Sequence, residues 1–304
     1  MNNIPSKQNE QRQLERLAAQ REIYPAAKKL HISQIVLTVV GPILLFIANL
    51  IWPILGAYSA LYGIVVFIID GVLIEPIIKT KKTKAAKIQE LFDCEVLELE
   101  TSPLKVVDDI TVEEILLYHN VHSKIKTNIE KIRDWYPKNI EQLPISIARI
   151  ICQRANCWWD SNLRRRYSNF LKYTGLLVFL SLFLYAFLAE FSLVQFVLIG
   201  SGLIPLFQFC NKQYTDHRDA ASRLDELVCY SQNVWSKTIS LDNPVLAKDD
   251  SRRLQDEIFE HRCKSPLILD PFFKIFRDEH EELMNKSTDI LIEEFNKAAN
   301  RVDG

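Results

Sequence analysis

Four apolar stretches constrain the fold of this 304-residue chain more than any other feature of its sequence. They are 33–52 (SQIVLTVVGPILLFIANLIW), 54–74 (ILGAYSALYGIVVFIIDGVLI), 171–190 (LKYTGLLVFLSLFLYAFLAE) and 191–210 (FSLVQFVLIGSGLIPLFQFC). Each is close to the roughly 20 apolar residues that a helix needs to cross a bilayer. Buried core helices of a soluble protein are the alternative, but two consecutive pairs of such stretches favour four membrane-spanning helices.

The connections and flanks of these stretches predict a topology. Trp52-Pro53 separates the first pair and Ala189-Glu190-Phe191-Ser192 the second, so each pair is expected to form a tight antiparallel hairpin. Lysines and arginines gather at the other ends of all four stretches, and neither hairpin tip carries one. Because cytoplasmic flanks are enriched in Lys and Arg, both termini and the middle of the chain are predicted to be cytoplasmic.

The resulting fold class is mostly α. It is a helical membrane protein with four transmembrane helices in two hairpins, plus a mainly helical cytosolic region with one or two short β-strands. The predicted segments are a cytosolic N-terminal amphipathic helix (1–32), transmembrane hairpin 1 (33–78), a cytosolic middle region (79–170), transmembrane hairpin 2 (171–210) and a cytosolic helical C-terminal region (211–304).

Local patterns assign structure within the cytosolic parts. CEVLELE (94–100) alternates as a β-strand does and needs a partner, either 103–107 or another subunit. Residues 108–137 are predicted to form a helix with Thr111 as N-cap, and 144–170 another helix. Three further helices, separated by prolines, are predicted in the C-terminal region.

Sequence motifs for catalysis or metal binding are missing. The chain has no GxxxxGK[ST], GxGxxG, HExxH or CxxC pattern, and only eight glycines from which to build a phosphate loop. The six cysteines are scattered, which suits a reducing compartment. His119 and His122 have no second pair at zinc-like spacing. We therefore predict no enzyme, no catalytic residue, no metal site and no cofactor.

The segment ARIICQRANCWWDSNLRRRYSNF (148–170) is unusually rich in arginine and tryptophan. Positions three and four apart in a helix share a face. The polar residues of this segment are therefore expected to form a stripe along one face, with Arg154 beside it. Arginine forks suit phosphate groups, and tryptophan faces suit nucleobases. The stripe consists of Arg149, Gln153, Asn156, Asp160 and Arg164.

Distance from the membrane separates the possible roles of this segment. A membrane flank accounts for 164–167, but Trp158 lies about 18 Å and Arg149 about 30 Å before Phe170 at the helical rise. For these residues two interpretations remain: a buried polar network in the cytosolic region, or a site for an anionic ligand. The candidate site for a cyclic nucleotide comprises Arg149, Gln153, Arg154, Asn156, Trp158, Trp159, Asp160 and Arg164.

Five residues in or beside the spans are candidates for a role in a pore or its gating. Asp70 and Glu75 are carboxylates at the cytoplasmic side of the second span, where ionisable groups suggest function. Gly200, Gly202 and Pro205 favour close packing and kinking of the fourth span.

Three blocks carry a family resemblance: LAAQREIYPAAK (17–28), LFDCEVLEL (91–99) and DWYPKNIEQLPISIARIICQRANCWWDSNLRRRY (134–167). With the two hairpins, they resemble the SMODS-associated four-transmembrane, pore-forming effector family of CBASS antiphage defence. The resemblance runs from about residue 8 to the C-terminal helices and is most specific in the middle block.

The resemblance implies a multi-pass protein of the bacterial inner membrane. Its expected partners are the lipid bilayer, a cyclic di- or trinucleotide from a cognate nucleotidyltransferase, and further copies of itself, with no DNA or RNA. Ligand binding would lead to oligomerisation, membrane permeabilisation and abortive infection. Two other hypotheses remain: a non-conducting membrane scaffold that recruits a cytosolic protein, and a small transporter, against which the lack of inverted-repeat signals counts.

Overall fold

The computed structural model describes residues 2–102, 109–241 and 244–302, and within these residues all regular structure is helical, with no strand. The helical elements, with η1 and η3 of the π type and η2 and η4 of the 3-10 type, are α1 (Ile4–Lys7), α2 (Gln11–Ile35), η1 (Val36–Val40), α3 (Gly41–Ile51), η2 (Pro53–Leu55), α4 (Gly56–Ile69), η3 (Asp70–Ile74), α5 (Glu75–Val96), α6 (Val112–His122), α7 (Lys126–Glu130), η4 (Lys138–Gln142), α8 (Ile145–Leu188), α9 (Leu193–Gly202), α10 (Ile204–Leu241), α11 (Pro244–Lys264) and α12 (Asp270–Val302).

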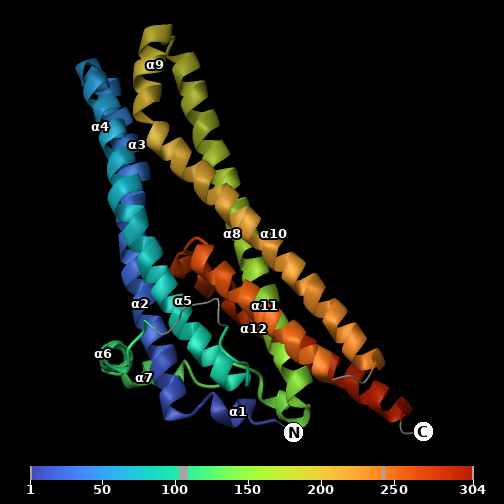
Figure 1. Ribbon diagram of the computed structural model, residues 1–304. Coiled ribbons are helices and arrows are strands. Elements are labelled where there is room, and N and C mark those ends of the chain that lie inside the picture. Colours follow the sequence, from blue (N-terminus) through green and yellow to red (C-terminus); the bar gives the residue numbers. More distant parts are fainter. Residues whose placement is uncertain (1, 103–108, 242–243, 303–304) are drawn as a thin grey trace.

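Two long arms extend from a cluster of helices near the N-terminus, as Figure 1 shows. In the first arm α2 continues through η1 into α3, and the chain returns through η2, α4 and η3 into α5. In the second arm α8 runs outward, and α9 and α10 return. We call the apolar parts of these helices the apolar arms, and the remaining helices with the polar ends of α2, α5, α8 and α10 the polar half.

Local chemistry explains both chain reversals. At the first, Trp52 leaves the helical region (φ −129°, ψ 89°) before Pro53, as expected because proline disfavours a helical conformation in the residue before it. At the second, Glu190 has φ 52°, and the Phe191 N–H donates to the Ala186 carbonyl at 3.2 Å. A left-handed residue with this six-to-one bond closes a helix C-terminus.

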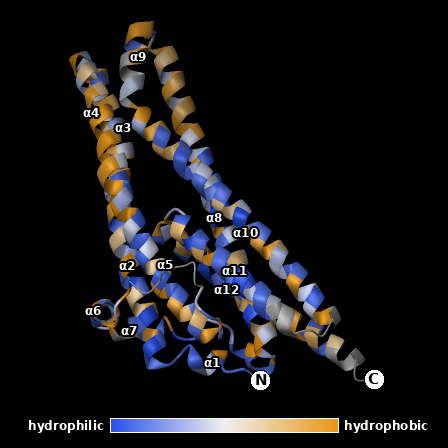
Figure 2. Cartoon of the chain, viewed as in Figure 1, coloured by the Kyte–Doolittle hydropathy of each residue, from blue (hydrophilic) through white to orange (hydrophobic). Residues whose placement is uncertain are grey.

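The arms have the composition of membrane-spanning segments. Three helices are long and apolar enough to cross a bilayer: Gln11–Ile51, Pro53–Val96 and Ile145–Leu188. The pair α9 and α10, bent by 55°, provides a fourth if it is counted as one span. Figure 2 shows hydrophobic residues concentrated along the arms and hydrophilic ones in the polar half. Side chains such as Ile54 (80% exposed) and Leu193 (78%) would contact lipid.

The strand predicted at 94–100 is wrong. Helix α5 continues to Val96, and Glu98 adopts φ 54°. The Leu99 N–H then donates to the Cys94 carbonyl at 2.8 Å and the Glu98 N–H to the Glu95 carbonyl at 3.4 Å, which together form a Schellman motif. The alternating apolar residues therefore bury the end of a helix in the core. The suggested partner at 103–107 lies outside the described residues. The described residues contain no strand.

The single helix predicted over 108–137 is also wrong in its extent. Thr111 caps α6 as expected, accepting from the Glu114 N–H, but α6 ends at His122 and only the short α7 follows. Tyr136 instead exchanges two backbone–side-chain hydrogen bonds with Gln8, at 2.7 and 3.1 Å. These bonds to the N-terminal segment hold the chain in a non-helical path that local propensity does not reveal.

The helix predicted over 144–170 and the third apolar stretch form one continuous helix, α8, and α10 to α12 confirm three helices in the C-terminal region. The main hydrophobic core lies in the polar half and joins α1, α2, α5, η4, α8, α10 and α12. Phe92, Tyr136 and Ile151, all at most 2% exposed, lie within it.

The two arms meet at small residues. A Cβ at Gly202 would stand 3.0 Å from the Ser59 Cβ and 3.4 Å from backbone atoms of Ser59. Ser59 also accepts a hydrogen bond from Asn49 at 2.7 Å, and Gly63 faces the ring of Pro205. The close packing predicted at Gly202 is therefore present, whereas no described atom lies within 4 Å of a Cβ at Gly200.

Replacement of Gly202 by leucine is expected to separate the arms at Ser59. Overpacking of this kind lowers the free energy of unfolding by about 1–3 kcal/mol. Thermal unfolding of the full-length protein in detergent micelles measures the change. Gly200→Leu is the matched control, because it adds the same side chain next to open space; equal destabilisation by both substitutions would contradict the contact.

Candidate functional site

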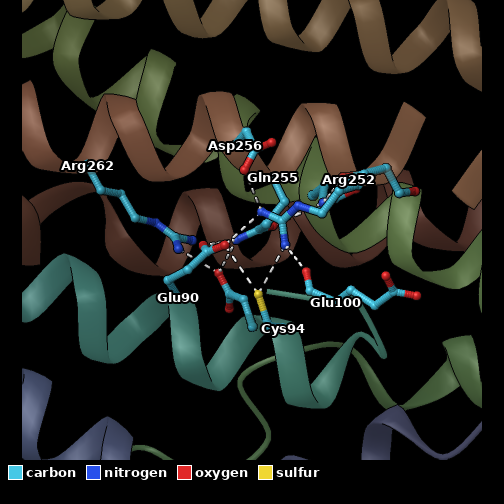
Figure 3. Close-up of polar contacts among 10 residues, drawn as sticks. Glu90, Cys94, Glu100, Arg252, Gln255, Asp256 and Arg262 are labelled. Atoms are coloured by element: carbon cyan, nitrogen blue, oxygen red, sulfur yellow. Dashed lines mark hydrogen bonds and ion pairs between the residues drawn. The ribbon is translucent and has the colours of Figure 1, made fainter. Parts of the chain in front are cut away.

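Two carboxylates of α5 are buried against α11 at the centre of the polar half (Figure 3). Asp93 is fully buried; Arg262 donates to its Oδ2 at 2.5 Å and Tyr136 to its Oδ1 at 2.8 Å. Glu90, 2% exposed, accepts from Arg252 at 2.8 Å and from Gln255 at 2.7 Å. Each buried negative charge therefore has an arginine and a neutral donor.

These pairs fix α11 to α5. Burial acts to lower the pKa of Arg262, but the charge of Asp93, together with Tyr136 and Glu90, outweighs it and raises that pKa above its ordinary value. Removal of one partner from a buried ion pair typically costs about 3–5 kcal/mol, because it leaves an uncompensated charge. The two helices should consequently move as one body.

Sequence reasoning missed the α5 and α11 residues of this network. No sequence pattern singles out Glu90, Asp93, Arg252, Gln255 and Arg262, because charged residues beside opposite charges on a helix are usually exposed. The available signal was their position on helices that also carry apolar residues of the main and neighbouring cores.

Two of the predicted ligand residues belong to this network. The Gln153 amide donates to Gln255 Oε1 at 3.0 Å and to the Ser251 carbonyl at 2.9 Å. Asn156 donates to the Tyr136 hydroxyl at 3.3 Å. Since Gln255 in turn donates to Glu90, a chain of amides connects α8 to α5 across α11.

Asp160 and Arg164 form a second cluster with α11. Asp160 Oδ2 accepts from Arg164 Nε at 2.9 Å and lies 3.1 Å from His261 Nε2. Arg164 also donates to the Pro266 carbonyl at 2.9 Å. Burial acts to raise the pKa of Asp160, but Arg164 and His261 outweigh it and hold that pKa below its usual range.

The grouping of Ser265, His261 and Asp160 is not a nucleophile relay. Ser265 Oγ and Asp160 Oδ2 approach the same ring nitrogen, Nε2 of His261, at 2.8 and 3.1 Å. A relay requires one partner on each ring nitrogen. The Ser265 hydroxyl also donates to the His261 carbonyl at 2.7 Å, so its proton is not directed at a base.

The remaining predicted ligand residues contact other elements. Arg154 donates to Ser287 of α12 at 3.2 Å, and Trp158 and Trp159 both pack against His280 of the same helix. Arg149, 5% exposed, donates from Nε to the Ile145 carbonyl. Within the described part of the chain, Arg149 Nη1 and Arg154 Nε are buried without a hydrogen-bond partner.

The eight residues thus do not share one surface. Gln153 and Asp160 contact α11, and Arg164 contacts Pro266 just after it. Arg154, Trp158 and Trp159 instead contact α12. Most of their polar atoms take part in contacts between helices. This arrangement corresponds to the first of the two interpretations of the segment, a buried polar network. The two unpartnered arginine donors are what an anionic ligand would satisfy.

Asp70 and Glu75, the two carboxylates among the predicted pore residues, lie where the arms leave the polar half. Gln34 of α2 donates to Asp70 at 2.6 Å and to Glu75 at 3.3 Å, and Lys212 of α10 pairs with Glu75 at 3.2 Å. This cluster connects the first arm to the second. Among the described residues, no group of three or more His, Cys, Asp or Glu side chains is placed to hold a metal ion.

The fold and this network define a multi-pass helical membrane protein whose polar half is joined by buried charge pairs. The chain belongs to the family of the SMODS-associating 4TM effector domain, which matches residues 2–291. This confirms the resemblance drawn from the three sequence blocks. The family is not a known class of enzyme.

One relative extends this assignment. The chain is 23% identical over 292 residues to a probable CBASS effector molecule of Bacillus cereus (strain VD146), covering 91% of this chain and 94% of that protein. No solved structure matches the chain. Family and relative together support a membrane effector of CBASS antiphage defence.

Two buried histidines predict a pH-dependent stability. Burial lowers the pKa of His217, with a further contribution from Arg164, and burial lowers that of His261 against the opposing effect of Asp160. The unfolded chain therefore takes up protons near pH 6.5 that the folded chain does not, and stability falls as pH drops below about 6.5.

Thermal unfolding in detergent at pH 7.5 and pH 5.5 measures this loss. His217→Gln should reduce the difference between the two melting temperatures, whatever its effect at a single pH. His119→Gln changes a histidine of α6 outside the cluster and should leave the difference unchanged. An unaltered pH dependence in His217→Gln would contradict the assignment.

Proposed function

We propose that this effector binds a cyclic oligonucleotide in its polar half, oligomerises and permeabilises the bacterial inner membrane, with both termini and the polar half in the cytoplasm. The observation that carries the proposal is the continuity of α8. This single helix of 44 residues begins in the buried polar network and ends at the tip of an apolar arm. A displacement of its polar end is thereby transmitted to the membrane without a hinge.

The proposed ligand contacts are those of α8: Arg149, Gln153, Arg154, Asn156, Trp158, Trp159, Asp160 and Arg164. Two buried arginine donors without a partner among the described residues support this choice, since phosphate oxygens would satisfy them. Because these residues face both α11 and α12, simultaneous contact requires α8 to separate from one of these helices. The ligand would therefore stabilise an opened state of the polar half.

In the membrane, we propose four spans arranged as two hairpins. The arms expose extensive apolar faces in a single copy, which supports a homo-oligomer as the conducting form. Asp70 and Glu75, held by Gln34 and Lys212, would control the separation of the arms. Gly202 and Pro205 would provide the contact about which they move, with Gly200 beside open space.

A second candidate function is a membrane scaffold that recruits a protein and conducts nothing. The observation that favours it is an apolar face of α6, where Leu117 and Val121 are 64% and 44% exposed. The two functions differ in whether the membrane becomes permeable.

Induction of the effector together with its cognate nucleotidyltransferase is expected to admit a membrane-impermeant dye into bacterial cells. Flow cytometry with propidium iodide measures the uptake. A synthase with its catalytic carboxylates replaced is the control and should give none. Recruitment of a protein without dye uptake in either strain would support the scaffold and contradict the pore.

Substitution of Arg154 by alanine is expected to weaken binding of the cyclic oligonucleotide by about tenfold or more, because a charge-assisted hydrogen bond contributes about 1.5–3 kcal/mol. Isothermal titration calorimetry on the full-length protein in detergent measures the affinity. Arg165→Ala, on the same helix but paired with Asp225, is the matched control. Equal affinity of Arg154→Ala and the unaltered protein would remove Arg154 from the site.

A further inference from the structure

A pocket opens between α2, α5 and α6, away from the ligand residues proposed on α8. It encloses about 250 Å³. One wall is charged and comes from α2; the opposite wall is aliphatic and comes from α5, α6 and the residue pair before α6. The charged wall consists of Arg12, Glu15 and Arg16, and the aliphatic wall of Leu91, Ile110, Val112 and Ile115.

The size of the pocket limits its occupant. Sites for whole drug-sized ligands enclose about 300–1,000 Å³, so this pocket holds a fragment, such as a phosphate with one ring attached. A surface with arginines on one side and aliphatic carbons on the other fits such an amphipathic anion.

Arg16 is held in a fixed orientation at the charged wall. The residue is 5% exposed, and its Nη1 donates to Glu95 Oε2 at 2.6 Å, to the Leu91 carbonyl at 2.9 Å and to Gln13 Oε1 at 3.1 Å. An arginine that is already immobilised loses little further entropy on binding an anion.

Arg12 is the accessible member of the pair. Its side chain is 68% exposed, and its Nη1 lies 3.6 Å from Glu95 Oε1. Two guanidinium groups therefore share one carboxylate, Glu95, near the C-terminus of α5. Glu15, the other acid of the pocket, accepts a hydrogen bond from Gln11 at 2.9 Å.

A buried donor beside Arg16 lacks an acceptor. Gln13 is fully buried, and within the described residues its Nε2 has no hydrogen-bond partner, although its Oε1 accepts from Arg16. An unpaired buried donor costs stability. Burial acts to raise the pKa of Glu95, but Arg16, Arg12 and Gln13 together lower it, so three donor side chains compete for this one carboxylate. A further anion would relieve this competition.

We propose that this pocket binds a phosphoryl group through Arg12 and Arg16 in exchange for Glu95, with the attached organic group against Leu91 and Ile115. Release of Glu95 breaks its contact with Arg16, which joins α2 to α5, and both of these helices continue into the first apolar arm. Phosphate binding is thereby coupled to the position of that arm. The identification of the phosphate with a cyclic oligonucleotide rests on the proposed function; the anion site itself does not.

Titration of pyrophosphate into the full-length protein in detergent, at constant ionic strength, tests the pocket by calorimetry. Arg12→Gln should weaken binding by about tenfold or more, because it removes a charge-assisted hydrogen bond. Glu95→Gln should strengthen binding by about tenfold, because it removes the competing carboxylate. A purely structural role for Glu95 would instead weaken binding.

Arg133→Gln is the matched control, an exposed arginine of the polar half outside the pocket. Equal binding by Arg12→Gln and the unaltered protein, an equal loss in Arg133→Gln, weaker binding by Glu95→Gln, or no binding to any form would each overturn the proposal.

Separate titrations identify the source of the phosphate. If cyclic di- and trinucleotides bind and their binding depends on Arg12, the phosphate belongs to the messenger. If phosphatidylglycerol vesicles bind with the same dependence, the phosphate belongs to a lipid headgroup. Arg12-dependent binding of pyrophosphate without binding of any cyclic nucleotide would support the pocket and contradict the proposed function.

Discussion

The burial of Glu90 and Asp93 against Arg252 and Arg262 is the constraint on which the rest of this structure depends. Carboxylates this far from water are tolerated only when cations and neutral donors both reach them. Supplying those partners brings α11 onto α5, and Gln255 extends the contact to Gln153 of α8. Because α5 and α8 each continue into a different apolar arm, the same set of charges determines how the two arms leave the polar half.

The arms themselves are joined by much weaker contacts. Along their apolar length they meet at Gly202 and Gly63, where small residues allow close approach, and at the rings of Phe46 and Tyr185, whose centroids lie 6.2 Å apart. At their base, the ion pair of Lys212 with Glu75 is partly exposed, and such pairs contribute about 0–1 kcal/mol. A molecule with a rigid polar half and loosely joined arms is suited to transmit a change at one end as a separation at the other.

The sequence was sufficient for several features set by hydrophobicity or by local capping. The apolar stretches and the N-cap at Thr111 each follow from a few neighbouring residues. Prediction failed where distant residues decide the conformation. The alternation at 94–100 reflects a helix end buried in the core, and the path around Tyr136 depends on Gln8, 128 positions away. Likewise, nothing local indicates that Asp93 is buried and Glu95 is not.

The same distinction sharpens the interpretation of the arginines. Arg252 and Arg262 have their charge matched by buried carboxylates, so no ligand gains by displacing those partners. Arg149 and Arg154 have buried donors without acceptors among the described residues, and Arg12 and Arg16 share a single carboxylate. An external anion is favoured only where the internal pairing is incomplete. Arg252 also has a buried Nε without a partner, but Glu90 matches its charge. The property that separates candidate ligand residues from structural ones is therefore the lack of a carboxylate of their own among the described residues, rather than exposure or position in an arginine-rich segment.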